Sequence, residues 1–290
     1  MLNSIQPGGS RRIIGFLRYS VVTEESVGHF ARTRRAGFAE ACAQVFDPRR
    51  LAARAALFEA ITLPCFRQQA TLGIPFELCV LVSPALPASW RDRLERSVAD
   101  APFVRLVEVA PDEQVAAVTE RVSYADLPPT VTHVTTFRID DDDCVSDDYM
   151  ALLAAASNDA NAGKVHSFNQ GFYAGLDADD QFFMYPRANT NNAWGLAFLA
   201  SASDGRTIFS LGRHSRIYEA AEVVINERPQ AWIRSVHDAG DRFTVPPAGG
   251  RGWLSRRDAE RIAAENFRFL DLARVEAAFR SARAADPLAA

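Results

Sequence analysis

The chain has 290 residues, of which 48% are hydrophobic, and a formal net charge of −4. This length and composition suit one large α/β domain or two small domains with a sizeable core, and they exclude a mainly disordered chain. The negative balance argues against a broad surface for nucleic acid or anionic membrane, and leaves a local basic pocket or a peripheral membrane contact open.

Cysteine usage and hydropathy predict a cytoplasmic protein. The four cysteines lie far apart without a CxxC pair, and three of them sit in apolar segments, as reduced core residues do. No apolar run reaches the length of a membrane span, and residues 1–12 lack the apolar stretch of a signal peptide. We therefore expect neither a membrane-spanning helix nor a signal peptide.

Apolar runs alternate with helical periodicities along the first half of the chain. Strands are expected at 13–22, 76–83, 103–109 and 131–139. Helices are expected at 49–66, with Pro64 marking the end, and around 90–98 and 115–122. Residues 24–48 show no clear period and predict a long loop. Strands that are apolar throughout and alternate with helices predict a mostly parallel sheet covered on both faces.

The second half of the chain is less regular. Ser146 to Asp148 are expected to cap a helix that begins at Tyr149. The predicted β elements are a long hairpin formed by 164–176 and 181–188, and short strands at 193–201, 207–212 and 229–237. The capping box of Ser255 and Asp258 opens a predicted C-terminal helix over 255–284.

Four consecutive aspartates, Asp140 to Asp143, follow the fourth predicted strand directly. Adjacent carboxylates repel one another unless a cation, a helix N-terminus or solvent offsets their charge. In parallel α/β sheets, ligands bind beyond the carboxyl ends of the strands. The position of the cluster therefore favours a binding site over a solvated run of charge.

Three metal-site interpretations compete for this cluster. A calcium loop of the EF-hand kind needs glycine at its sixth position and glutamate at its twelfth, where counting from Asp140 gives Val145 and Ala151. A haloacid-dehalogenase-type phosphotransferase would use Asp140 as nucleophile, but that motif usually closes the first strand of its domain. The DXD motif of nucleotide-sugar glycosyltransferases holds Mg²⁺ or Mn²⁺ against a diphosphate and follows several strands, as here.

Segments around the aspartates decide between these interpretations. FLRYSV, RLAARAALFEAITLPCFRQQ, FELCVLVSPALP and TFRIDDDD together resemble the rhamnosyltransferase family of GT-A type glycosyltransferases, and PQAWIRSVH extends the match to about His237. The resemblance implies a GT-A (Rossmann-like) α/β fold with a mixed, mostly parallel sheet, an irregular α+β C-terminal half and a C-terminal helix. We expect a flexible tail at 1–10 and one domain at 11–290, with a nucleotide-binding half (11–145), an acceptor-binding half (146–254) and the helix at 255–284.

The resemblance also implies roles for the charged residues. Asp140 and Asp142 would bind Mn²⁺ or Mg²⁺ and Asp143 would assist, with Asp141 and Asp143 as the alternative pair. His237, 95 residues after Asp142, would be a third metal ligand, and His214 is a weaker competitor. The residues placed to meet the nucleotide are Arg18, Ser20, Ser83 and Arg138. Arg54 is either a buried structural partner or a ligand contact.

The acceptor side is less defined. An inverting enzyme needs a base for the acceptor hydroxyl, and we select Asp238 because it adjoins His237, with Glu222 and Glu219 as alternatives; a retaining enzyme needs none. The segment 189–201, with Trp194 and Gly195, suits sugar recognition. Arg32, Arg34 and Arg35 are either a solvated loop or a cover for bound diphosphate.

These expectations combine into one predicted function. The chain would transfer a sugar, rhamnose by the family's name, from a nucleoside-diphosphate sugar to an acceptor hydroxyl of a saccharide or glycoconjugate. The alternatives are the phosphotransferase with Asp140 as nucleophile and a metal- or nucleotide-binding protein without turnover. No nucleic-acid partner is expected, and the oligomeric state stays open.

Overall fold

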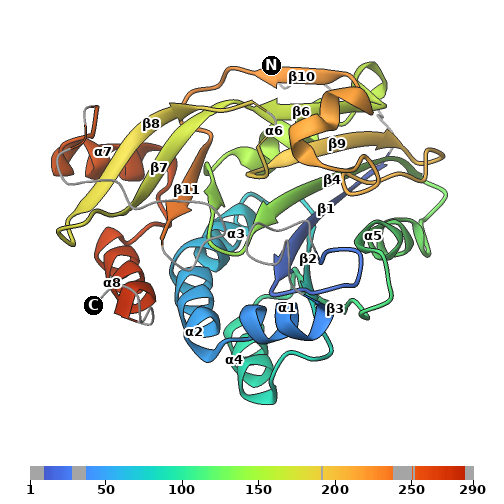
Figure 1. Ribbon diagram of the computed structural model, residues 1–290. Coiled ribbons are helices and arrows are strands. Elements are labelled where there is room, and N and C mark those ends of the chain that lie inside the picture. Colours follow the sequence, from blue (N-terminus) through green and yellow to red (C-terminus); the bar gives the residue numbers. More distant parts are fainter. Residues whose placement is uncertain (1–9, 28–36, 191, 238–249, 251, 285–290) are drawn as a thin grey trace, which may run out of the picture.

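Two β-sheets form the centre of the structure (Figure 1). The computed structural model describes residues 10–27, 37–190, 192–237, 250 and 252–284. The larger sheet has seven strands in the order β10-β6-β9-β4-β1-β2-β3. Their bounds are β1 Ser10–Tyr19, β2 Glu77–Val82, β3 Val104–Glu108, β4 Val131–Asp140, β6 Lys164–Phe168, β9 Leu196–Ser201 and β10 Val223–Asn226. The smaller sheet has the order β5-β11-β7-β8, formed by β5 Cys144–Val145, β7 Gln170–Leu176, β8 Phe182–Ala188 and β11 Trp232–Val236.

Strand direction follows the sequence pattern of the first half. β1 lies between β2 and β4 and is parallel to both, and β3 is parallel to β2. β9 is antiparallel to β4 and to β6, whereas β10 is parallel to β6. The predicted Rossmann-like α/β fold with a mixed, mostly parallel sheet is confirmed.

Helices cover both faces of the large sheet. Alternate residues of the buried strands point to opposite faces, so Leu17 and Val80 pack against α2 and α3, whereas Phe16 and Leu81 pack against α5. The helices of this half are α2 Pro48–Leu57, α3 Leu63–Ala70, α4 Ala88–Val98 and α5 Val115–Tyr124. Figure 1 shows α2 and α3 on one side of the sheet and α5 on the other. None of the helices in the described ranges is long and apolar enough to cross a membrane.

The helix predicted to end at Pro64 continues to Ala70. A π-helical turn, Phe58–Thr62, joins α2 to α3, and the backbone N–H of Leu63 reaches the carbonyl of Phe58 five residues earlier. This wider turn places Pro64 in the first turn of α3, where its missing N–H leaves no hydrogen bond unmade. The prediction of an end at Pro64 was wrong because proline is tolerated at the start of a new helical segment.

Part of the predicted loop at 24–48 is helical. α1, Phe38–Val45, lies in this range, and Ala41 is its one fully buried residue. Phe38, Ala41, Cys42 and Val45 do recur at helical spacing, but this period covers only eight residues between polar segments, and the prediction of a loop was wrong there. The first strand also ends at Tyr19 rather than Val22, because Ser20 adopts a left-handed backbone with φ of 55°.

The C-terminal segment forms two helices in place of the one predicted over 255–284. α7 spans Arg256–Asn266 and α8 spans Leu272–Ala284. Ser255 caps α7 as predicted, accepting a hydrogen bond from the Asp258 N–H. Asp271 accepts hydrogen bonds from the Ala273 and Arg274 N–H groups at 3.0 and 3.2 Å, and so opens α8 with a cap of its own.

Three predictions in the middle of the chain need correction. Residues 164–188 give β7 and β8 as the expected hairpin, but β6 leaves it to join the large sheet. Residues 207–212 form turns instead of a strand. The helix α6, Tyr149–Ala156, has no side-chain cap, because Asp147 accepts hydrogen bonds from Arg268 and Asp148 is bonded to Arg228. The short 3₁₀ turns are Asp159–Asn161 and His214–Glu219.

Candidate active site

The four aspartates form a tight turn at the carboxyl end of β4. Asp140 is the last residue of the strand and lies in register with Arg18 of β1, 3.7 Å from its guanidinium. Both side chains are partly exposed. The Asp143 N–H then turns back to the carbonyl of Asp140, which carries the chain from the large sheet to β5 of the smaller one.

The π-helical turn and α3 position residues 143–146 through hydrogen bonds from two buried side chains. The Thr62 hydroxyl donates to the Asp143 carbonyl at 2.8 Å, and the Gln69 amide donates to the Ser146 carbonyl at 2.8 Å. Both side chains are fully buried. The wider turn thus has a positioning task, as π-helical turns often do near functional sites.

Arg54 of α2 balances the charge of Asp141 and Asp142. It forms an ion pair with Asp141, which is fully buried, and its Nη1 lies 2.9 Å from Oδ2 of Asp142. Burial by itself would raise the pKa of Asp142, but the charge of Arg54 and the hydrogen bond from His237 outweigh burial and hold this pKa well below its usual range. Arg54 is thus a buried partner of both aspartates, and its contact with a ligand stays a prediction.

His237 lies beside Asp142, although 95 residues separate them in the chain. Its Nε2 is 2.7 Å from Oδ2 of Asp142, an arrangement that requires a proton on Nε2. β11 brings His237 here, because Ser235 on the same strand donates its N–H to Asp143 at 2.8 Å and its hydroxyl to the Asp142 carbonyl. The buried Nδ1 of His237 has no hydrogen-bond partner among the described residues.

The pKa of Asp143 is shifted in the opposite direction to that of its neighbour Asp142. Burial, and after it the charges of Asp142 and Asp140, raises the pKa of Asp143 well above its usual value, while Arg234 and the Ser235 N–H oppose this shift. A raised pKa favours the neutral carboxyl, which binds a metal ion poorly. The contact of Asp143 with the Ser235 N–H instead connects the turn after β4 to β11. The pair of Asp140 and Asp142 is thus easier to reconcile with a metal than the alternative pair of Asp141 and Asp143.

Arg138 and Arg18 face the same side of the sheet as Asp140. Arg138 is buried, and its guanidinium carbon lies 5.0 Å from the ring centroid of Phe209. Its Nε has no hydrogen-bond partner among the described residues. Burial, and then the nearby charge of Arg18, lowers the pKa of Arg138 to about 10, while Asp140 acts in the opposite direction.

The two predicted nucleotide-contacting serines have local partners. Ser20 accepts a hydrogen bond from Arg50 at 3.2 Å. The Ser83 hydroxyl accepts from the Ala85 N–H at 3.2 Å, and its carbonyl accepts from Arg91. Both serines lie at the carboxyl edge, and their contacts with a nucleotide stay a prediction.

The candidate bases Glu222 and Glu219 do not meet the aspartates. Val223 of β10 is in register with Val165 of β6, and through β9 this level corresponds to Thr136 of β4. Glu222 therefore lies about 16 Å from Asp140 along the strand direction, and β10 is three strands away from β4 in the sheet. Glu222 pairs with Lys164 at 3.3 Å, and Glu219 pairs with Arg216 at 2.8 Å. Asp238, Arg32, Arg34 and Arg35 lie outside the described residues, and His214 begins the 3₁₀ turn before β10.

The sequence pattern did not predict a role for Arg234, whose guanidinium packs against aromatic rings. The guanidinium carbon of Arg234 lies 5.1 Å from the ring centroid of Tyr173 and 4.9 Å from that of Trp194. Trp232 closes this group, 4.6 Å from Trp194. The alternation of Trp232 and Arg234 along one strand was a weak signal, because their partners come from β7 and from the segment before β9.

The donor types near Asp142 fit a metal site that a ligand completes. Two carboxylates and one imidazole suit Mn²⁺ better than Mg²⁺. In the part of the chain that the structure describes, no three His, Cys, Asp or Glu side chains are arranged to share one ion. Asp142 and His237 do converge, and Asp140 lies at the same edge. Further oxygens would have to come from the bound ligand.

Fold and site together define the class of protein. This is a Rossmann-like α/β protein with a charged site at the carboxyl edge of its parallel strands, where such folds bind their ligands. The sequence model of the family described as putative rhamnosyl transferase matches residues 12–249, and the chain belongs to this family, as its motifs predicted. The description of the family points to a glycosyltransferase. No curated protein matches the chain.

Proposed function

We propose that the chain is a metal-dependent GT-A glycosyltransferase that moves a sugar from a nucleoside-diphosphate sugar to an acceptor hydroxyl. The description of the family suggests rhamnose as the sugar. The reaction we propose would belong to polysaccharide or glycoconjugate synthesis. The donor would lie over the carboxyl ends of β1, β2 and β4.

The observation that carries this proposal is the buried cation of Arg138. Arg138 is buried against Phe209, where the charge of Arg18 opposes its own and Asp140 compensates it only in part, so a further anion would lower the free energy of this arrangement. Its place at the ligand edge of the sheet supports a diphosphate as that anion. Planar guanidinium groups bind phosphate oxygens in a bidentate manner, which suits Arg138 and Arg18 to this role.

Asp142, Asp140 and His237 would hold Mn²⁺ or Mg²⁺ beside the diphosphate. The bound ion would supply charge neutralisation for the phosphate oxygens as the leaving group departs. Arg54 keeps Asp142 ionised in a buried setting, so this carboxylate is ready to bind a cation at neutral pH. The resting contact between His237 and Asp142 would open when an ion binds.

The arginine–aromatic group of Arg234, Tyr173 and Trp194 would form the acceptor side. Aromatic faces pack against sugar rings, and the Arg234 guanidinium can donate hydrogen bonds to hydroxyl groups. In the reaction, the acceptor oxygen bonds to the anomeric carbon and the bond from this carbon to the diphosphate oxygen breaks. The bonding electrons leave with the diphosphate. In an inverting enzyme the acceptor proton passes to a base, for which Asp238 stays our prediction.

A binding and turnover experiment tests the proposal. Thermal unfolding is measured with a panel of nucleoside diphosphates and nucleotide sugars, each with and without Mn²⁺, and nucleoside diphosphate release is then followed for the ligands that stabilise the protein. We expect at least one nucleotide to raise the melting temperature in a Mn²⁺-dependent way, and Arg138→Met to remove that shift. A panel without any metal-dependent shift would contradict the proposal.

The same experiment separates the two alternatives. A phosphorylated Asp140, trapped without any nucleotide sugar, would favour the phosphotransferase. Binding of a nucleotide sugar with metal, but without hydrolysis or transfer to candidate acceptors, would favour a binding protein without turnover.

A further inference from the structure

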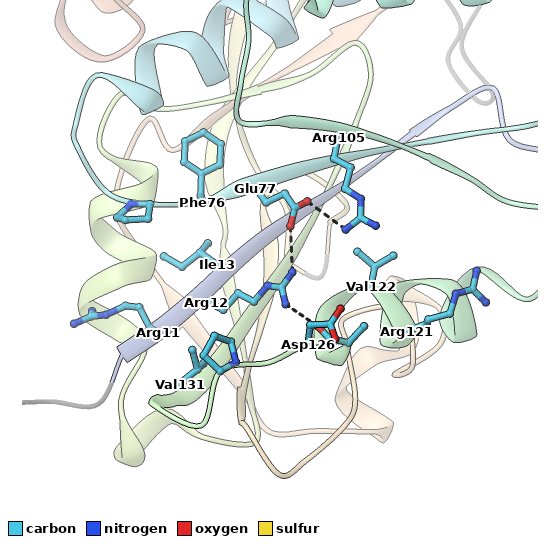
Figure 2. A pocket seen from close by; sticks show the side chains of 13 residues that line it. Arg11, Arg12, Ile13, Phe76, Glu77, Arg105, Arg121, Val122, Asp126 and Val131 are labelled. Atoms are coloured by element: carbon cyan, nitrogen blue, oxygen red, sulfur yellow. Dashed lines mark hydrogen bonds and ion pairs between the residues drawn. The ribbon is translucent and has the colours of Figure 1, made fainter.

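A cavity of about 660 Å³ opens at the amino-terminal edge of the parallel strands, the edge opposite to the aspartates (Figure 2). Its walls come from the starts of β1, β2, β3 and β4, from the end of α5 and from the segment between α5 and β4. No predicted site residue lines it. It is therefore separate from the proposed donor site.

The floor of the cavity is a row of charged residues on three neighbouring strands. Arg12 of β1, Glu77 of β2 and Arg105 of β3 each stand two positions before a buried apolar residue of the same strand. Side chains two apart share a sheet face, so this row continues the face that packs against α5. Three charges at positions that would otherwise extend an apolar core need a reason.

The charges of this row are only partly compensated. Glu77 is shared by two guanidinium groups, 3.3 Å from Arg12 and 3.6 Å from Arg105, and both distances exceed the usual length of a charge-assisted hydrogen bond. The other contacts of Arg12 are long ones, to the backbone carbonyls of Ser123 and Ala125 at 3.3 Å. Of the other lining arginines, Arg121 is paired with Glu113 at 2.9 Å and Arg11 donates to the Ala154 carbonyl. The row itself therefore holds two cations, Arg12 and Arg105, that share the single carboxylate of Glu77.

The remaining walls are apolar. Val122 lies on the face of the charged row, whereas Ile13 and Phe76 belong to the opposite face of the sheet edge (Figure 2). Two prolines, Pro75 and Pro128, complete the apolar lining. An apolar cavity with a few convergent donors is the usual form of a small-molecule site. The lining therefore fits a ligand with an apolar or aromatic body and one anionic group.

We propose that this cavity binds a small organic anion, a phosphate or carboxylate carried on an apolar or aromatic body. The anion lies between Arg12 and Arg105 and takes over part of the role of Glu77, and the body packs against Val122 on the same face of the sheet. This would be a second ligand site of the protein, independent of the donor site.

Isothermal titration calorimetry with phenyl phosphate tests the proposal, using benzoate, inorganic phosphate and phenol as comparison ligands. We expect phenyl phosphate or benzoate to bind more tightly than inorganic phosphate and phenol, because only these two offer both an anion and an aromatic body. The stronger of the two identifies the anionic group. Absence of saturable binding by either would overturn the proposal.

Variants assign the binding to the cavity. Arg105→Gln should weaken binding about tenfold through the loss of a charge-assisted hydrogen bond. Glu77→Gln should strengthen binding, because it removes the competing carboxylate. Arg96→Gln, on the exposed side of α4, and Arg138→Met, at the donor site, should leave binding unchanged.

Two outcomes contradict this assignment. If Arg138→Met abolishes binding while Arg105→Gln does not, the probe occupies the donor site. If Glu77→Gln weakens binding, the charged row is a structural ion-pair network. Because the probe needs neither Mn²⁺ nor a nucleotide, failure here leaves the proposed transferase function untouched.

Discussion

The two edges of the large sheet carry similar charges in different surroundings. At the carboxyl edge, Arg54, Asp142 and His237 are nearly enclosed and joined by contacts of 2.7 to 2.9 Å. At the amino edge, Arg12, Glu77 and Arg105 are joined by contacts of 3.3 to 3.6 Å, and more than half of the Arg105 side chain is exposed.

The degree of burial sets how much each ion pair contributes to stability. A buried charge that loses its partner is strongly destabilising, whereas a solvated charge loses little. The carboxyl edge therefore depends on its pairs for the fold, while the amino edge can exchange a partner for a ligand. Four measurements test whether the two edges differ in this way.

The largest effect is expected from Arg54→Met. This change leaves the buried Asp141 and Asp142 without their main cation, so the free energy of unfolding should fall by about 3–5 kcal/mol. Arg105→Met at the amino edge is the matched control and should cost less than about 1 kcal/mol. Urea unfolding at pH 7 measures both, and equal losses would show that the two edges do not differ.

Asp142→Asn should reduce turnover more than stability. It removes one carboxylate from the proposed metal site, so kcat/KM for sugar transfer should fall roughly 100-fold or more. Asp126→Asn, the same change at the amino edge, should leave kcat/KM unchanged. Steady-state kinetics with saturating Mn²⁺ give the comparison, and a mild effect equal to that of Asp126→Asn would contradict a role for Asp142 at the metal.

Arg138→Met should separate stability from binding. Replacing a buried cation by an apolar side chain of similar length should leave the free energy of unfolding unchanged or raise it by about 1 kcal/mol. The dissociation constant for the nucleoside diphosphate should rise by about tenfold or more. A loss of stability, without any change in nucleotide affinity, would make Arg138 a structural residue.

The smallest effect on stability is expected at the half-buried ion pair of Glu59 and Arg93. Burial would raise the pKa of Glu59, but hydrogen bonds from Arg93 at 2.7 to 2.8 Å and from Ser97 lower it. A lowered pKa in the folded state stabilises the fold above the unfolded value of about 4.3, and this stabilisation is lost as the pH falls through the folded value. Glu59→Gln should therefore cost about 1 kcal/mol or less at pH 7 and progressively less in acid. Urea unfolding between pH 3 and 7 tests this, and a cost independent of pH would refute it.

Much of the first half of the fold was predictable because its signals are local. Apolar runs gave β1 to β4 within a few residues, and their alternation with helices gave the parallel arrangement. Two helix boundaries were predicted wrongly because the same residue type is compatible with two local structures. Pro64 can end a helix or begin one, and Asp271 can lie within a helix or cap the next.

The sequence by itself determined the family, the class of fold and the position of four aspartates at the ligand edge of the sheet. The resemblance also predicted His237 as a metal ligand together with Asp142; the structure places the two side chains in contact, and metal binding stays a prediction. Only the tertiary structure decided that Arg54 neutralises Asp141 and Asp142, that Arg234 lies between Tyr173 and Trp194, and that Glu222 is far from the aspartates. These relations join residues from distant parts of the chain, and a local pattern contains no information about which strands and helices meet across the core.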